Sequence, residues 1–247
     1  MKGSKFFTRI FSAAMALAVT CTCSNIVSPE IAAKASYSDA DITISASTSS
    51  ISDAVDYTAV ANAYNKIISH PANYFKKTIK SEKKEFGKNR KKKNYRYKLV
   101  DITGDGIPEL FLEGDFYYDC GTGQTKKEII KYDSYSPYLN IFTYKSGKAV
   151  RLTGLGNDFS LFYGVLGCSL FRASENKGIY LNSVERFTGD NYYDYYKKKK
   201  KNKLVRVSSK SKTVKYYEKK PSEVKSEIKN FTKVSKKITA ESVKNAK

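Results

Sequence analysis

The spacing of apolar residues changes along the chain, and each spacing predicts a different element. Over residues 53–68, apolar side chains recur at helical spacing, which predicts a helix with Asp53 as a candidate N-cap. This helix should end near His70, because a residue that precedes proline avoids the helical conformation. Residues 74–86 have a weaker pattern that fits either a helix or a loop. We therefore expect an N-terminal helix.

After Asn94 the apolar spacing shortens to every second residue. Tyr95, Tyr97 and Leu99 alternate with basic residues, as expected of a strand with one buried face. Turn-forming residues such as Ser146-Gly147 separate the short runs that follow. The further strands that this pattern predicts are 110–112, 139–144, 149–152, 167–172, 178–183, 192–196, 203–207 and 213–217. Consecutive short strands with tight turns predict an antiparallel meander.

Helical spacing returns near the C-terminus. A helix is expected over residues 221–234, because Val224, Ile228 and Phe231 share one helical face and Pro221 suits the first position of a helix. The predicted fold class is α+β, an antiparallel β-meander with an N-terminal helix and a C-terminal basic helix. We assign the α+β domain to residues 53–220, and the basic C-terminal helix and tail to residues 221–247. The 20 Tyr and 13 Phe residues supply a core and suit half-exposed sheets.

The first residues have the pattern of a secretory signal peptide. The apolar run over residues 10–19 is shorter than the roughly 20 residues that a bilayer-spanning helix needs. Ala33-Lys34-Ala35 provides a small-residue cleavage site, which assigns residues 1–35 to the signal peptide and residues 36–52 to a flexible leader. The alternatives are an uncleaved membrane anchor and a lipid anchor on Cys21. We expect a secreted, extracellular protein, and association with the cell wall is compatible with this location.

Two cysteines, Cys120 and Cys168, follow the signal segment. An exported chain meets an oxidising environment, where this pair is a candidate disulfide that would stabilise the fold by about 4 kcal/mol. Two unbridged thiols are the alternative.

The segment "DITGDGIPEL", residues 101–110, places oxygen-bearing groups at alternating positions of a short turn. Gly106 permits a sharp reversal, and the Ile107 carbonyl adds a further oxygen. Calcium prefers six to eight such oxygens, so we predict Ca²⁺ as a cofactor with a structural role. The candidate ligands are Asp101, Thr103, Asp105, the Ile107 carbonyl and Glu109.

This loop resembles the D-x-[DNT]-G-D-G-x-x-[DE]-[LIV] loop of EF-hand-like sites, dockerin-type repeats and FG-GAP repeats. It is most similar to the FG-GAP form, in which the loop joins two strands. Secreted Gram-positive proteins of unknown function carry a similar single loop, followed by a strand and a later hairpin like residues 141–150 here. The resemblance implies a calcium-binding β-hairpin.

Two departures from the pattern imply a weaker site than a full EF-hand. Thr103 replaces an Asp or Asn, and Leu112 occupies the position of the bidentate Glu. The alternative is a metal-free hairpin in which Asp101 and Asp105 accept hydrogen bonds from backbone N–H groups.

The formal net charge is +21, and most of the excess lies in the last fifth of the chain. Residues 197–247 contain 18 Lys and one Arg against four Glu. Such a charge attracts an anionic cell-wall polymer or a membrane surface, and the attraction should weaken with salt. Nucleic acid is a less favoured partner, and a solvated lysine surface without a partner is the alternative. The candidate anion-binding residues are Lys197, Lys198, Lys199, Lys200 and Lys201.

Enzymatic chemistry has little support in the sequence. His70 is the single histidine, and no nucleophile, zinc or phosphate-loop motif occurs. Carboxylate pairs, Asp115 with Asp119 or Asp190 with Asp194, leave a secreted hydrolase such as a glycosidase as an alternative. We assign no catalytic residue and predict a secreted, calcium-binding module for an anionic surface.

Overall fold

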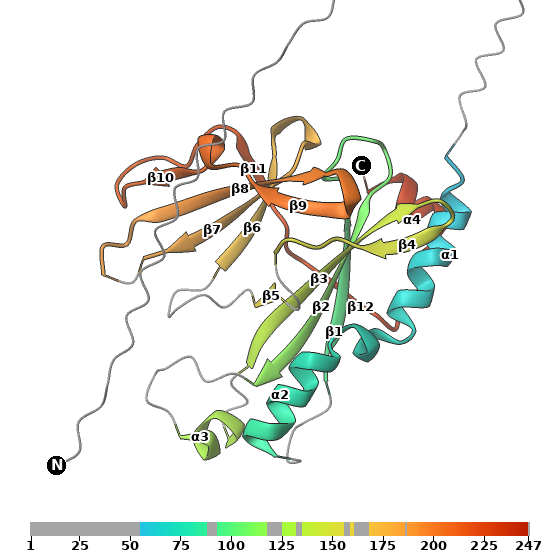
Figure 1. Cartoon of the computed structure of the whole chain (residues 1–247), viewed down its shortest axis with the longest axis horizontal. Helices are drawn as coiled ribbons and strands as arrows, with labels where there is room; N and C mark the ends of the chain where they lie inside the picture. The colour runs from blue at the N-terminus through green and yellow to red at the C-terminus, as the bar shows by residue number, and fades with distance from the viewer. Residues whose placement is uncertain are drawn as a thin grey trace, which may run out of the picture. The chain divides into compact units, whose positions relative to one another are not determined.

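The structure, a computed structural model, describes residues 55–87, 93–117, 125–131, 135–155, 159–160, 168–185 and 187–246 (Figure 1). The signal peptide and leader assigned to residues 1–35 and 36–52 lie outside these ranges, as do Cys120 and Asp119. Residues 51–247 form one compact unit, which therefore includes the C-terminal segment.

Four α-helices occur in the described part of the chain. They are α1 (Tyr57–Ile68), α2 (Lys76–Phe86), α3 (Lys126–Lys131) and α4 (Ala240–Lys244). The N-cap of α1 is Asp56 rather than the predicted Asp53, which lies outside the described residues; the Asp56 side chain accepts a hydrogen bond from the Ala59 amide at 2.9 Å. The predicted N-terminal helix is thus confirmed, and the ambiguous second segment is a helix. No helix among the described residues has the length and apolar character needed to cross a membrane.

The strands form two antiparallel sheets (Figure 1). Sheet A has the order β12-β1-β2-β3-β4, with β5 also paired to β3. Its strands are β1 (Tyr95–Val100), β2 (Glu109–Tyr117), β3 (Tyr135–Lys145), β4 (Lys148–Arg151), β5 (Phe159–Ser160) and β12 (Thr232–Lys233). Sheet B has the order β10-β8-β7-β6-β11, with β9 also paired to β8. Its strands are β6 (Cys168–Ala173), β7 (Ile179–Val184), β8 (Asn191–Lys199), β9 (Lys203–Arg206), β10 (Lys212–Val214) and β11 (Val224–Glu227).

Sheet A is covered on both faces. Alternate residues of β2 point to opposite sides, so Leu110 and Leu112 join the helix-facing core with Tyr64 of α1. Phe111 points the other way and packs with Leu170 of β6 in the core between the two sheets. This two-sided burial explains why β2 is buried along its whole length. The arrangement is helix on sheet on sheet, the layered packing expected of an α+β protein.

The opposite face of sheet B carries a second aromatic core. Tyr180, Tyr193 and Tyr195 are buried there with Val224 of β11. The ammonium of Lys210 lies 5.4 Å from the centre of the Tyr195 ring, which is a cation–π contact. One ring of this tyrosine core therefore lies beneath a lysine side chain.

The fold class is confirmed as α+β with antiparallel strands and helices near both ends, but the helix expected over 221–234 is wrong. That segment forms the edge strands β11 and β12, and the C-terminal helix α4 lies further on. Asn230 adopts a positive φ of 60°, which interrupts any helix through the segment. The apolar residues that suggested a helix are divided among different cores, since Val224 and Ile228 pack on different clusters.

Candidate functional site: an acidic loop beside a lysine strand

The acidic loop joins β1 to β2, between two neighbouring strands of sheet A. Val100 pairs with Glu109 across the base of the loop. Gly104 and Gly106 have φ values of 72° and 79°, a region that favours glycine, and they let the chain reverse within a few residues. The backbone here therefore has the form predicted from the sequence, a loop between two strands.

Backbone donors surround the first carboxylate of the loop. Asp101 is buried; its Oδ1 accepts from the amides of Thr103 at 3.0 Å and Gly104 at 2.7 Å, and its Oδ2 accepts from Gly106 at 3.1 Å. Asp105 Oδ1 accepts from the Ile107 amide at 2.9 Å. These bonds are those expected of the metal-free hairpin. Each oxygen has two lone pairs, so the bonds do not exhaust the acceptor capacity of the loop.

The side chain of Glu109 faces sheet B and is fully buried. Its Oε2 accepts from the Ile102 amide at 3.1 Å, and its Oε1 accepts from Thr143 Oγ1 at 3.1 Å and Lys198 Nζ at 3.3 Å. Burial raises the pKa of Glu109 to about 7, although the Lys198 ammonium opposes this rise. Lys198 thus supplies a cation to this carboxylate from within the protein.

The metal ligands predicted from the sequence are only partly brought together. Asp101, Thr103, Asp105 and Ile107 share the loop, whereas the side chain of Glu109 is engaged with Thr143 and Lys198. Within the ranges that the structure describes, no group of three or more His, Cys, Asp or Glu side chains is placed to hold a metal ion.

The five candidate anion-binding lysines differ in their surroundings. Lys198 points inward, where its Nζ also donates to Thr143 at 2.8 Å. The other four, Lys197, Lys199, Lys200 and Lys201, are exposed. None of these four forms an ion pair within the described part of the chain. They extend from the end of β8 through the 3₁₀ turn η3 (Lys200–Asn202) toward β9.

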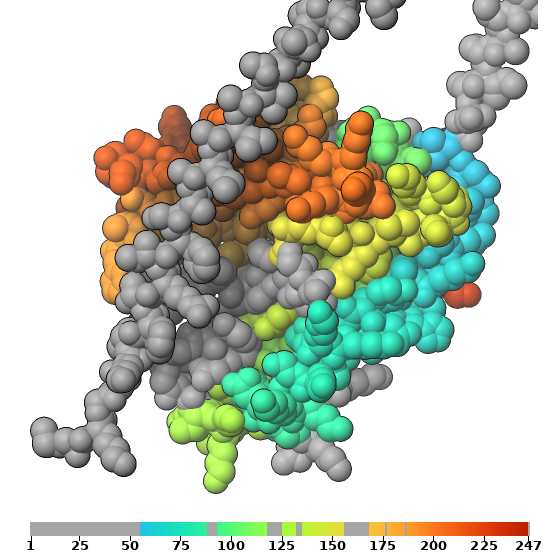
Figure 2. Space-filling view, viewed as in Figure 1, coloured from blue at the N-terminus to red at the C-terminus, as the bar shows by residue number. Residues whose placement is uncertain are grey.

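The acidic loop and the lysine strand share a hollow of about 320 Å³. One side consists of Ile102, Thr103 and Asp105 from the loop. The other side consists of Lys177 and of Lys197, Lys198 and Lys199 from β8. In Figure 2 the orange atoms of the β8–β9 region stand beside the green atoms of the loop region. Residues almost a hundred positions apart in sequence therefore form one polar site.

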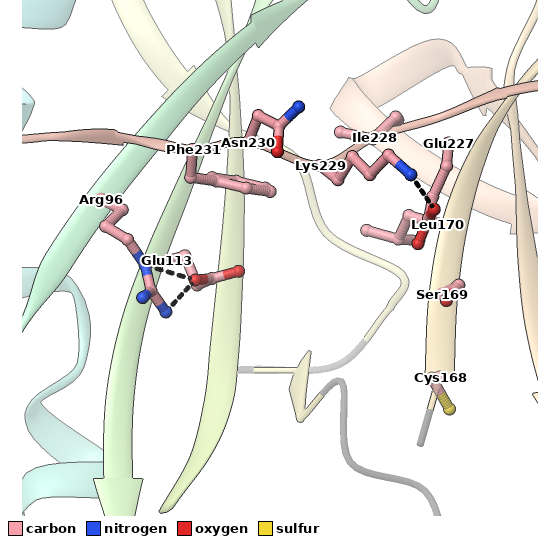
Figure 3. Close-up of a pocket in the computed structure, with 10 residues that line it drawn as sticks. All are labelled: Arg96, Glu113, Cys168, Ser169, Leu170, Glu227, Ile228, Lys229, Asn230 and Phe231. Carbon is pink, nitrogen blue, oxygen red and sulfur yellow. Dashed lines mark hydrogen bonds and ion pairs between the residues drawn. The ribbon is translucent and has the colours of Figure 1, made fainter. Parts of the chain in front are cut away.

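A second polar cluster lies between the sheets, beside a pocket of about 340 Å³ (Figure 3). Arg96 of β1 forms an ion pair with Glu113 and another with Asp115, the latter at 2.7 Å. Burial raises the pKa of both carboxyl groups, and the Arg96 guanidinium opposes this rise. Arg96 and Glu113 were not among the residues predicted from the sequence, although the alternation in β1 and β2 places them on one face of the sheet.

The carboxylate pairs considered for a hydrolase each have other partners. Asp115 is held by Arg96, and its suggested partner Asp119 lies outside the described residues. Asp190 accepts from Lys215 at 2.8 Å, and Asp194 forms an ion pair with Arg206 at 2.6 Å. Asp190 directly precedes β8 and Asp194 lies within it, and four residues of extended chain span about 13 Å between Cα atoms, whereas glycosidase carboxylates lie roughly 5–10 Å apart.

The sequence also singled out one histidine and two cysteines. His70 is exposed, and its Nδ1 lies 3.0 Å from the Ser69 hydroxyl at the end of α1. Cys168 is half-buried at the start of β6, while Cys120 lies outside the described residues, so the disulfide stays a prediction. Comparison with family models, curated proteins and solved structures finds no match to this chain.

Proposed function

We propose that this protein is an exported binding module that attaches to an anionic surface of the cell envelope through its lysine hairpin. The lysine hairpin is defined here as residues 197–203, from the end of β8 to the start of β9. The observation that supports this proposal is the group of exposed lysines at its tip, Lys197, Lys199, Lys200 and Lys201, which have no ion-pair partner within the described residues. The hydrogen bonds of the hairpin already fix its backbone, so a ligand can bind these unpartnered lysines with little further loss of conformational entropy.

An anionic polymer or membrane gains from such a surface mainly by electrostatic attraction. Each lysine near an anionic membrane contributes about 1 kcal/mol at moderate ionic strength. The attraction is screened over about 10 Å at 0.1 M salt, so binding should weaken steeply as salt rises. A hydrophobic attachment would lack this dependence.

The test uses the full chain with two variants of equal charge loss. The first replaces Lys197, Lys199, Lys200 and Lys201 with Gln. The matched control replaces four exposed lysines of α2, Lys76, Lys77, Lys80 and Lys83, with Gln. Sedimentation with purified cell walls and with phosphatidylglycerol vesicles measures binding at low and high salt.

We expect the hairpin variant to bind at least about tenfold more weakly at low salt, because four favourable contacts are lost. The α2 variant should change far less. Equal losses in both variants would show that net charge alone drives binding, and this would contradict a localised binding surface.

We further propose that the acidic loop binds Ca²⁺ as a structural site, with oxygens from Asp101, Thr103 and Asp105. Asp105 is exposed, and within the described residues its Oδ2 accepts no hydrogen bond. With Glu109 held by Lys198, the ligand set is small, so we expect an affinity in the range of about 10⁻⁴–10⁻³ M typical of extracellular modules.

Titration calorimetry and thermal melting with several millimolar Ca²⁺, compared with a chelator, test this proposal. We expect a measurable heat and a higher melting temperature with calcium, both of which Asp105→Asn should reduce. A wild-type protein that shows no heat and an unchanged melting temperature would exclude the site.

A further inference from the structure

We propose that the hollow between the acidic loop and the lysine strand is a binding site for the phosphate ester of a polyol. The proposal rests on the anionic-surface function above, because it assigns one site to a repeating unit of such a polymer. It is carried by the chemistry of the lining groups, which divide into a cationic side and a hydrogen-bond-accepting side.

The cationic side favours an anionic group. Lys197 and Lys199 alternate along β8 and have no ion-pair partner within the described residues, and both border the hollow. Lys177 adds a third ammonium; its own pair with Glu175, at 2.7 Å, is largely exposed and therefore weak. These ammonium groups attract an anionic ligand such as a phosphate ester electrostatically.

Lys198 is a cation on this side that is already held in position. Its ammonium is held by Glu109 at 3.3 Å and by Thr143 at 2.8 Å, so it does not need to be ordered when a ligand enters. Groups that are already positioned bind a ligand with a smaller loss of side-chain entropy.

The loop side selects a hydroxyl-bearing ligand. A carboxylate repels a bare phosphate, but the unbonded Oδ2 of Asp105 is an acceptor for a ligand hydroxyl, and the Thr103 side chain offers a second polar contact. The volume of about 320 Å³ lies at the lower end of small-molecule sites, which fits a unit the size of glycerol phosphate.

The experiment titrates the full chain with sn-glycerol 3-phosphate and with inorganic phosphate, in chelator so that calcium does not occupy Asp105. Glycerol phosphate should bind about fivefold more tightly than phosphate, because one added hydrogen bond is worth about 1 kcal/mol. Asp105→Ala should remove this preference. A double variant, Lys197→Gln with Lys199→Gln, should weaken the binding of both ligands, whereas Lys76→Gln with Lys77→Gln on α2, outside the hollow, should leave the binding of both unchanged.

Each outcome separates the site from the general function. If cell walls still bind in a salt-dependent way but glycerol phosphate does not bind, or binds equally to the Lys197 and Lys199 variant, the site is overturned while the surface function stands. If glycerol phosphate binds no more tightly than phosphate, the polyol assignment is wrong. If cell walls and anionic vesicles fail to bind at low salt, the surface function itself fails.

Discussion

Two regions of the molecule carry opposite charges: the acidic loop between β1 and β2, and the lysine hairpin of β8 and β9. They differ in how far their charges are paired within the protein. The loop carboxylates receive internal donors: Asp101 from three backbone amides, and Glu109 from Lys198. At the tip of the hairpin, by contrast, Lys200 and Lys201 are exposed and have no ion-pair partner in the described part of the chain. Charge that is compensated internally contributes to the fold, and charge that is not remains available to a ligand.

The two regions meet at Lys198, whose neighbours on both sides face solvent. This residue belongs to the lysine run by sequence but to the acidic region by contact. A single residue therefore allows the comparison to be tested.

The largest effect should come from removing the inward lysine. Lys198→Met keeps the length of the side chain but leaves the buried Glu109 carboxylate without its cation, which costs about 3–5 kcal/mol when a buried pair is broken. Urea unfolding at pH 8 measures the change. The matched control, Lys199→Met on the exposed side, should change stability by less than about 0.5 kcal/mol. Equal effects would mean that Lys198 is not distinguished by its contacts.

A smaller effect should appear in the pH dependence of stability. Because the pKa of Glu109 is raised to about 7, the folded protein keeps a proton that the unfolded chain has already released. Stability therefore falls as pH rises between the unfolded and folded pKa values, and this group accounts for a loss of about 2 kcal/mol between pH 5 and pH 8. Glu109→Gln should lose this part of the dependence. If the variant and the wild type lose the same amount over this range, the assignment to Glu109 is wrong.

The smallest effect concerns the loop backbone. Gly106 and Gly147 have φ values of 79° and 78°, and a Cβ added at either position meets no atom within 4 Å. Without calcium, an Ala at either position should cost about 1–2 kcal/mol from backbone strain alone. With millimolar calcium, the loss of stability caused by Gly106→Ala should increase, and the loss caused by Gly147→Ala should not. Melting temperatures with and without chelator make the measurement, and identical responses of the two variants would argue against calcium in this loop.

Much of the sheet structure was predictable from local alternation. The pattern around Tyr95 and Tyr97 matches β1, and the predicted strand 178–183 matches β7 to within one residue. The acidic loop was also predictable, because its spacing and glycines are local. Neither depends on distant parts of the chain.

The pairing partners were not predictable in this way. β11 and β12 are short edge strands that complete sheets formed much earlier in the chain, so their spacing alone favoured a helix. Likewise, Lys198 and Glu109 are separated by 89 residues, and nothing in a run of lysines marks the one that turns inward. The hollow and its cationic side depend on that distant contact.

The C-terminal segment gives each sheet an outer strand, since β11 pairs with β6 and β12 pairs with β1. Synthesis proceeds from the N-terminus, so β1 and β6 each keep one edge unpaired until residues 224–233 have been made. Completion of both sheets is therefore delayed until late in translation, and the edges of β1 and β6 stay open to pairing with other strands until then.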